Sequence, residues 1–204
     1  ISTPILITGA KGFIGSNLLR KLIHEGYETN IILRNKDNCW RINDIINKTN
    51  IFIEDLNNFK KINKIINNLK PKTIFHLAAY GAYEHQNEFE KIKVVNLDST
   101  INLLNACSMV DFNIFINTGS NSEYGYKKYP MKETDLLTPN SYYAVFKAAS
   151  TLYCQYESIR KKLPIITVRP FHVYGPYEEK TRLIPNLISK LLLNKYPPLS
   201  SPEN

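Results

Sequence analysis

The sequence predicts a doubly wound α/β fold, in which a parallel sheet carries helices on both faces. Three observations support this: strand-like and helix-like stretches alternate, a glycine-rich turn joins the first strand to the first helix, and candidate functional residues follow the strand ends. The expected strands are residues 4–8, 29–34, 50–54, 73–77, 113–118 and 164–169. The expected helices are residues 13–26, 37–48, 57–69, 88–109, 141–162 and 181–194.

The turn after the first strand has the pattern Gly-x-x-Gly-x-x-Gly, followed by apolar residues at helical spacing. Gly9 can turn sharply, Gly12 lets backbone amides approach a pyrophosphate, and Gly15 lets the helix pack closely on the strand. The amides that open the helix, those of Phe13 and Ile14, would bind the phosphates. The alternative is a glycine turn that only joins strand to helix. Strand and helix on the correct sides favour a nucleotide site.

The later strands are also followed by candidate ligand-binding residues. In doubly wound sheets, ligands bind at the carboxyl ends of the strands, near the point where the strand order reverses. The sequence places such residues after the second to fifth strands: Arg34, Asp55, Ala78 with Ala79, and Ser120.

Tyr143 and Lys147 carry the candidate chemistry. They lie four residues apart in an expected helix, so both face the same side. A free phenol titrates near pH ~10, and a neighbouring ammonium favours the phenolate and brings proton transfer toward neutral pH. The spacing alone is more often found on a solvated helix face; the functional interpretation depends on the glycine turn upstream.

The composition bears on other classes of function: nucleic-acid binding, metal binding and membrane association. The chain has 204 residues, 43% of them hydrophobic, and a formal net charge of +8. Its lysines are interleaved with Asn and Ile on amphipathic faces, so nucleic-acid binding is ranked last, and the positive charge suits an anionic cofactor and substrate. The three scattered cysteines have no metal or redox spacing and predict the reduced thiols of a cytoplasmic protein, and the isolated histidines predict no metal site. The absence of a long apolar stretch predicts no membrane partner.

With these motifs in place, the chain resembles the extended short-chain dehydrogenases/reductases, and among them the NAD(P)-dependent nucleotide-sugar epimerase/dehydratase family. The resemblance runs from Ile5 to about Pro185 and includes residues 76–79, Asn96, residues 120–125 and residues 168–176. It implies a Rossmann-type NAD(P)-binding domain over residues 1–170 and the beginning of an incomplete substrate-binding domain over residues 171–204. Family members run longer, so we expect this chain to be a fragment or trimmed form.

The resemblance also implies residue roles. Tyr143 would be the acid/base, Lys147 would hold the nicotinamide ribose and favour the phenolate, and Ser120 would bond the same reacting oxygen. Asn96 would be structural. Further cofactor contacts would come from Asp55 and Leu56 beside the adenine and from Ala78, Ala79 and Pro170. Substrate contacts would come from His172 and Arg182, and Tyr124 and Glu123 would each be either a substrate or a packing contact. Residues 88–109 and 141–162 would form a homodimer interface.

Two departures from the family pattern narrow the reaction. Dehydratases of the family carry an acidic pair after the catalytic hydroxyl, where this chain has Asn121 and Ser122. The second strand ends in Arg34 where an NAD-binding protein normally has a carboxylate, which predicts NADP over NAD. Asp37 is the alternative ribose ligand, if the turn is shifted.

These observations favour reduction of a nucleoside-diphosphate 4-keto-6-deoxyhexose, with hydride from NADPH and a proton from Tyr143. The first alternative is a nucleoside-diphosphate-sugar 4-epimerase that retains NAD. The second is a nucleotide-binding module without catalysis.

Overall fold

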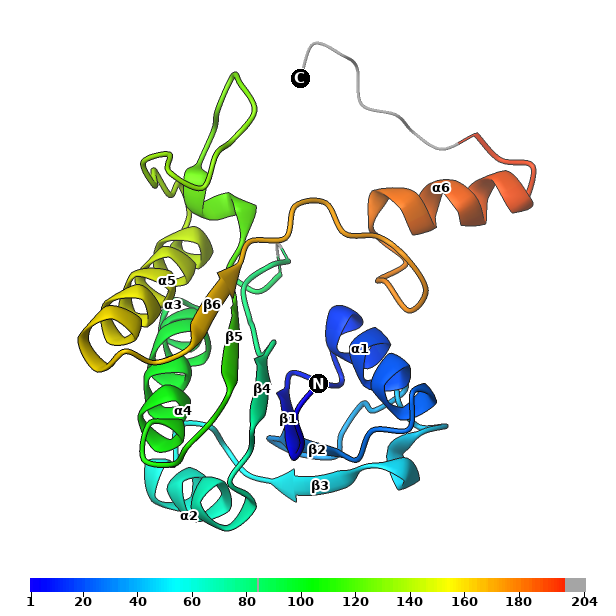
Figure 1. Ribbon diagram of the computed structural model, residues 1–204. Coiled ribbons are helices and arrows are strands. Elements are labelled where there is room, and N and C mark those ends of the chain that lie inside the picture. Colours follow the sequence, from blue (N-terminus) through cyan, green and yellow to red (C-terminus); the bar gives the residue numbers. More distant parts are fainter. Residues whose placement is uncertain (84, 197–204) are drawn as a thin grey trace. The chain divides into compact units, whose positions relative to one another are not determined.

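The computed structural model describes residues 1–83 and 85–196 (Figure 1). The chain divides into two compact units, residues 1–171 and 172–204. The first contains the sheet and most of the helices. In the second, the described residues contain one helix, α6 (Leu183–Leu192), which begins after the extended residue Arg182. That this second unit begins a substrate-binding domain stays a prediction.

The first unit is built on a six-stranded sheet whose paired strands are all parallel. Its spatial order is β3-β2-β1-β4-β5-β6, the order of a dinucleotide-binding sheet, with the reversal between β1 and β4. The six expected strands are confirmed, with ends shorter by one or two residues. The strands are β1 (Ile5–Thr8), β2 (Thr29–Leu33), β3 (Asn50–Ile53), β4 (Thr73–His76), β5 (Ile114–Thr118) and β6 (Ile165–Val168).

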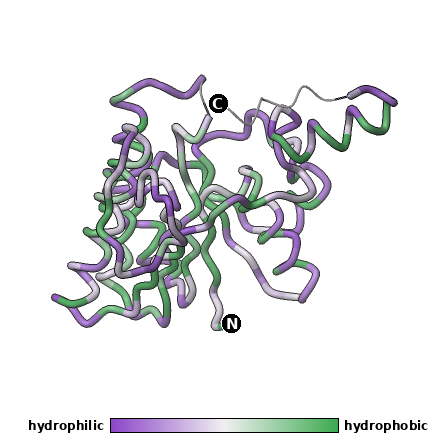
Figure 2. The backbone as a smooth tube through the Cα atoms, turned by 90° about the horizontal axis from the view of Figure 1, so that it is seen from above, coloured by the Kyte–Doolittle hydropathy of each residue, from purple (hydrophilic) through white to green (hydrophobic). Residues whose placement is uncertain are grey.

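Five of the six expected helices are confirmed. The α-helices of the described residues are α1 (Phe13–His24), α2 (Phe59–Leu69), α3 (Phe89–Lys93), α4 (Ser99–Cys107), α5 (Tyr142–Lys161) and α6. Between them lie the 3-10 helices η1 (Ile46–Lys48) and η3 (Asn121–Tyr124) and the π-helix η2 (Val94–Asp98), which joins α3 to α4. The expected helix 88–109 is therefore continuous but contains one wide turn. Apolar and polar stretches alternate along the outer helices, as amphipathic packing requires (Figure 2).

The expected helix over residues 37–48 is wrong. The segment instead forms successive three-residue turns, in which the amide of Ile42 donates to Cys39 O and that of Ile45 donates to Ile42 O, at 2.8 and 3.0 Å. The same three side chains are buried against α1 and the sheet. Apolar residues at a strict spacing of three suit such turns, and over twelve residues that spacing resembles the 3.6-residue period of an α-helix.

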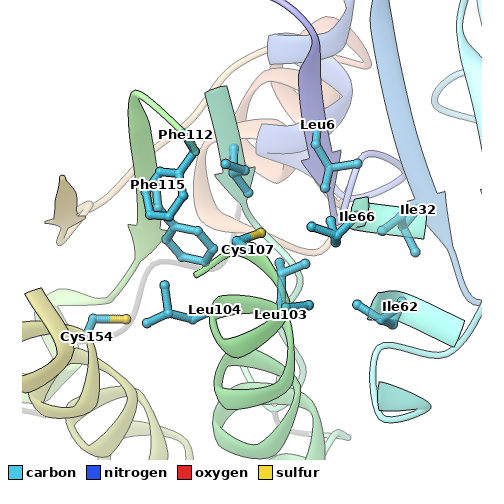
Figure 3. Packing of buried hydrophobic residues seen from close by; sticks show 12 residues of the cluster. Leu6, Ile32, Ile62, Ile66, Leu103, Leu104, Cys107, Phe112, Phe115 and Cys154 are labelled. Atoms are coloured by element: carbon cyan, nitrogen blue, oxygen red, sulfur yellow. The ribbon is translucent and has the colours of Figure 1, made fainter. Parts of the chain in front are cut away.

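Two apolar layers hold the sheet between its helices. On one face, Leu6, Ile74 and Phe115 of the strands pack with residues of α2 and α4 (Figure 3). On the other face, α1 and the turns over residues 39–45 cover Ile5, Ile7 and other strand residues. The central strands β1 and β2 are buried at every position, as expected for parallel strands covered on both sides.

None of the described helices is long and apolar enough to cross a membrane.

Candidate active site

The glycine-rich turn is shaped by contacts that leave no room for side chains. Gly9 has a φ of +71°, and a Cβ there would lie 2.5 Å from the backbone carbon of Leu77 after β4. A Cβ on Gly15 would lie 2.2 Å from Gly9 O. Gly12 is the extended residue before α1, and its amide donates to Gly9 O at 2.9 Å. The turning and packing roles expected for Gly9 and Gly15 are thus confirmed.

The first amides of α1, which include those of Phe13 and Ile14, have no acceptor within the helix and lie at its positive end. An anionic pyrophosphate is the group that such a turn suits, because backbone can approach it closely and donate to it. The residues present therefore fit a dinucleotide.

Lys147 is buried on α5, with 3% of its surface exposed. The helix begins where Ser141 Oγ accepts from the amide of Ala144 at 3.2 Å, which places Tyr143 in the first turn and Lys147 in the second. Burial lowers the pKa of Lys147 from 10.5 to about 8, and the negative charge of Glu123 opposes that effect. Tyr143 is partly buried on the same face of α5. The pair therefore combines a cation of reduced pKa with a phenol.

Ser120 lies directly after β5 and caps η3. Its Oγ accepts from the amide of Ser122 at 3.2 Å, and its own amide donates to Glu123 Oε1 at 2.8 Å, which together form a capping box. The next amide, that of Asn121, donates to Pro170 O at 3.2 Å. Ser120 and Pro170, predicted from distant parts of the sequence, are therefore brought side by side.

Glu123 is the centre of a buried polar cluster that the sequence did not predict. Its carboxylate is fully buried and pairs with Arg169 Nε at 2.7 Å, while Thr151 Oγ1 of α5 donates to it at 3.1 Å. A second nitrogen of Arg169 donates to the hydroxyl of Tyr124 at 2.9 Å. Tyr124 is itself buried, and its hydroxyl is held by this hydrogen bond; its substrate role stays a prediction.

The ends of β1 and β4 are joined by a second polar chain. The two ring nitrogens of His76 bond to Thr8 Oγ1 at 2.7 Å and to Thr100 Oγ1 at 2.9 Å. Burial, with the nearby charge of Lys147, lowers the pKa of His76 to about 3, so the ring is neutral. Thr8 Oγ1 also accepts from the amide of Ala78 at 3.3 Å, which holds Ala78 and the following Ala79 beside the glycine turn.

Asn96 has the structural role that the family resemblance implied. It lies in the π-helix η2, and its side-chain amide donates to Tyr80 O at 2.6 Å and to Ile92 O at 2.8 Å. The loop after β4 is thereby tied to the helix that follows it.

The strand ends on the other side of β1 carry the remaining expected cofactor residues. Arg34 is exposed after β2. Lys11 Nζ, from the glycine turn, donates to Asn35 O at 3.1 Å and to Asp37 O at 2.7 Å, so the two loops are tied together. Asp55 Oδ1 accepts from the amide of Asn57 at 2.8 Å, a contact that shapes the turn after β3.

Leu56 lies in that same turn, and its carbonyl accepts from Asn102 of α4 at 3.4 Å. His172 and Arg182 belong to the second unit and are described there only: both are exposed, and Arg182 is the residue before α6. Among the described residues, no group of three or more His, Cys, Asp or Glu side chains is placed to bind a metal.

A parallel sheet of this strand order, with a glycine turn after its first strand, is a Rossmann-type dinucleotide-binding fold. Within that class, the model of the NAD dependent epimerase/dehydratase family matches residues 5–202, and the chain belongs to this family.

Proteins of similar sequence include both an epimerase and a dehydratase. The chain is 30% identical over 216 residues to an uncharacterized UDP-glucose epimerase of Bacillus subtilis, covering 94% of this chain and 63% of that protein. It is 29% identical over 212 residues to the dTDP-D-glucose 4,6-dehydratase of Dictyostelium discoideum, covering 94% and 48%. The chain thus spans less than two thirds of the length of either relative.

Solved structures of two 4-epimerases have a similar fold. The UDP-N-acetylglucosamine 4-epimerase of Methanobrevibacter ruminantium, in complex with UDP-N-acetylmuramic acid, superimposes with a TM-score of 0.83 at 28% identity, over 95% of this chain and 64% of the other. The UDP-glucuronic acid 4-epimerase of Bacillus cereus, in complex with NAD, gives 0.80 at 28% identity, over 94% and 63%.

Proposed function

We propose that this chain is the cofactor-binding and catalytic part of an enzyme that moves a hydride between a nicotinamide dinucleotide and a sugar carbon of a nucleoside-diphosphate hexose. The observation that carries the proposal is the buried Lys147 of reduced pKa, four residues after Tyr143 on the helix that also contacts η3. Family membership and the glycine turn support the cofactor class.

In this proposal, Tyr143 transfers the proton and the nicotinamide, when bound, supplies or accepts the hydride. The ammonium of Lys147 favours the phenolate, so the Tyr143 hydroxyl can exchange a proton with the reacting sugar oxygen near neutral pH. Ser120 would donate to the same oxygen and stabilise its negative charge. The neutral ring of His76 keeps a second positive charge away from Lys147.

Water elimination is the family reaction that the site supports least. The positions after Ser120 hold Asn121 and Ser122 rather than carboxylic acids. Glu123, the next acidic residue, is fully buried and paired with Arg169, so it is not placed to protonate a leaving hydroxyl.

Two reactions at the sugar C4 remain, and each has its own support. Epimerization is favoured by the similar proteins, since both solved structures named above are 4-epimerases. Reduction of a 4-keto-6-deoxy sugar is favoured by Arg34, whose guanidinium is exposed after β2 and suits the 2′-phosphate of NADPH. Both use the same proton transfer by Tyr143.

The deciding experiment incubates a full-length version with nucleotide 4-ketosugars plus NADPH or NADH, and in parallel with UDP-glucose and UDP-N-acetylglucosamine plus NAD. Consumption of reductant at the nicotinamide absorbance band identifies the reductase. Interconversion of the C4 epimers without net cofactor consumption identifies the epimerase. A Tyr143→Phe variant should lose either activity; cofactor binding with no turnover by the wild type would instead support a non-catalytic module.

We also propose a homodimer through α5. Its outer face exposes apolar side chains at spacings that repeat along the helix: Tyr142, Val145, Leu152, Tyr156 and Ile159. A Leu152→Glu change should convert a dimer to a monomer in light scattering, with an Asn47→Glu change in the exposed turn η1 as the control. A wild-type monomer at micromolar concentration would refute the proposal. The cytoplasmic location stays a prediction, with which the buried free thiols of Cys39, Cys107 and Cys154 agree.

A further inference from the structure

A buried carboxylate lies next to the proposed catalytic residues without being one of them. Glu123 receives hydrogen bonds from three parts of the fold: the amide of Ser120 after β5, Thr151 Oγ1 on α5, and Arg169 Nε after β6, at 2.8, 3.1 and 2.7 Å. No part of its surface is exposed. It therefore joins the elements that carry the proposed hydroxyl, the proposed acid/base and the segment leading to Pro170.

We propose that Glu123 is a positioning residue for the proposed reaction: its carboxylate fixes the Ser120 main chain against the catalytic half of α5. The proposal rests on the function proposed above. Glu123 touches neither substrate nor cofactor in this role; it acts through Ser120 and Lys147.

The local geometry links the carboxylate to both residues. One carboxylate oxygen accepts the Ser120 amide, and this bond sets the direction from which the Ser120 side chain leaves the backbone. The same oxygen accepts from Thr151, which lies one helical turn after Lys147 on the same face of α5. A single oxygen atom therefore joins the two catalytic segments.

The chain also keeps space for this carboxylate. A Cβ on Gly119, directly before Ser120, would lie 2.4 Å from Glu123 Oε1. Any side chain at that position would displace either the carboxylate or the end of β5. The absence of a side chain next to the candidate catalytic hydroxyl is thus explained by the carboxylate behind it.

Stability alone does not account for the cluster. A buried ion pair contributes little net stability, because desolvation of both charges offsets their attraction, and apolar residues of similar volume are often as stable. What such a pair provides is fixed geometry, since each oxygen and nitrogen requires its partner in one direction. Fixed geometry is what Ser120 and α5 need if they are to meet at one sugar oxygen.

The carboxylate also acts on Lys147 through its charge. Burial lowers the pKa of Lys147 to about 8, and the charge of Glu123 opposes this, favouring the ammonium. The other titratable groups near Lys147 are His76 of β4, which is neutral, and Cys154 and Tyr143 of α5. Without the Glu123 charge, the lysine would lose its proton at a lower pH.

The test compares three variants of the full-length enzyme. Glu123→Gln removes the charge and keeps the shape, and Glu123→Asp keeps the charge but withdraws it by one methylene. Glu157→Gln is the matched control. Glu157 is also a buried glutamate, but it lies near the end of α5 away from Lys147 and pairs with Arg160 and Lys161. Thermal melting of each variant shows whether it folds.

Turnover is measured with UDP-glucose and NAD, or with whichever nucleotide sugar of the panel above is converted. We expect both Glu123 variants to lose about 10- to 100-fold in kcat with little change in KM, because a displaced hydroxyl affects the transition state more than binding. Glu157→Gln should lose stability but keep its kcat. If Glu123→Gln does not fold, Glu123→Asp decides alone.

The charge effect is read without any substrate. In protein labelled with lysine ¹³Cε, the chemical shift of Lys147, assigned with a Lys147→Arg variant, reports its protonation against pH. We expect the Lys147 titration to move down by about one pH unit in Glu123→Gln, and to stay near wild type in Glu123→Asp and Glu157→Gln. A lower kcat without this movement still supports positioning through Ser120.

Wild-type kcat in Glu123→Gln or, where that variant does not fold, in Glu123→Asp would overturn the proposal, whatever the lysine titration does. This result is distinguishable from failure of the proposed function. If Tyr143→Phe abolishes turnover while the Glu123 variants keep it, only the positioning role is lost; if Tyr143→Phe has no effect, the proposed chemistry itself fails.

Discussion

Burial of Lys147 lowers its pKa and also lowers the stability of the fold, so a Lys147→Met change should make the protein more stable. In the unfolded chain the lysine titrates at its ordinary value of 10.5, and in the folded protein burial brings the pKa to about 8. Each pH unit between these values corresponds to about 1.4 kcal/mol, so at pH 7 the buried ammonium destabilises the fold by about 3 kcal/mol. Methionine has a similar length and carries no charge.

The sign follows from the protons bound in each state. Between pH 8 and 10.5 the unfolded chain holds the Lys147 proton and the folded protein does not, so wild-type stability rises with pH through that window. Below pH 8 both states are protonated and the destabilisation is at its full value. Lys147→Met should therefore be more stable than wild type by about 3 kcal/mol at pH 7 and by only about 1 kcal/mol at pH 9.5.

Urea unfolding of both proteins at the two pH values measures this difference directly. Because the comparison is between variants at one pH, the titration of other groups cancels. Lys64→Met, on the exposed face of α2, is the control and should change stability by less than about 0.5 kcal/mol at either pH. A Lys147→Met protein that is less stable at pH 7, or a gap that does not narrow at high pH, would refute the reasoning. The variant should also lose turnover.

Three further outcomes are expected. Gly15→Ala should weaken NADH binding by more than about tenfold and lower stability by about 1–3 kcal/mol, because its Cβ would lie 2.2 Å from Gly9 O; fluorescence titration that shows wild-type affinity would contradict this. Arg34→Asp should reverse a preference for NADPH over NADH, each hydrogen bond to the 2′-phosphate contributing about 10- to 100-fold in affinity, and tighter wild-type binding of NADH than NADPH would count against the NADP prediction. Phe115→Ala should lower the free energy of unfolding by about 3–5 kcal/mol, measured in urea, since Phe115 is fully buried between the sheet and α4; a loss below 1 kcal/mol would show that the core collapses around the site.

The strands and the glycine turn could be predicted because their signals are local. Ile5, Leu6 and Ile7 are an uninterrupted apolar run, and the glycines follow at fixed spacing, so a few adjacent residues determine each element. The turns over residues 39–45 could not be distinguished from a helix, since their buried residues recur every third position. The π-helix at Asn96 has no local signal, because Asn96 is one of several polar residues in the segment 88–109.

The polar clusters around the site were not predictable from local pattern. Glu123 and Arg169 are separated by 46 residues, and only the adjacency of β5 and β6 brings them together. Glu123 also lies in a 3-10 turn and not in a strand, so the alternation of a strand does not determine the direction of its side chain. Thr8 and His76 meet because β1 and β4 are adjacent, and Thr100 reaches His76 from α4.

The tie made by Lys11 has a consequence for redesign of nucleotide preference. One ammonium gathers two carbonyls and a side-chain oxygen of the loop after β2, so the path of that loop is set from the glycine turn and not only by its own residues. If residues 34–37 were exchanged for those of a relative, the new side chains would stand on a main chain whose path Lys11 still fixes. Exchanging residue 11 together with the loop should preserve the contacts between the two segments. Exchanging single residues of the loop should therefore change nucleotide preference less reliably.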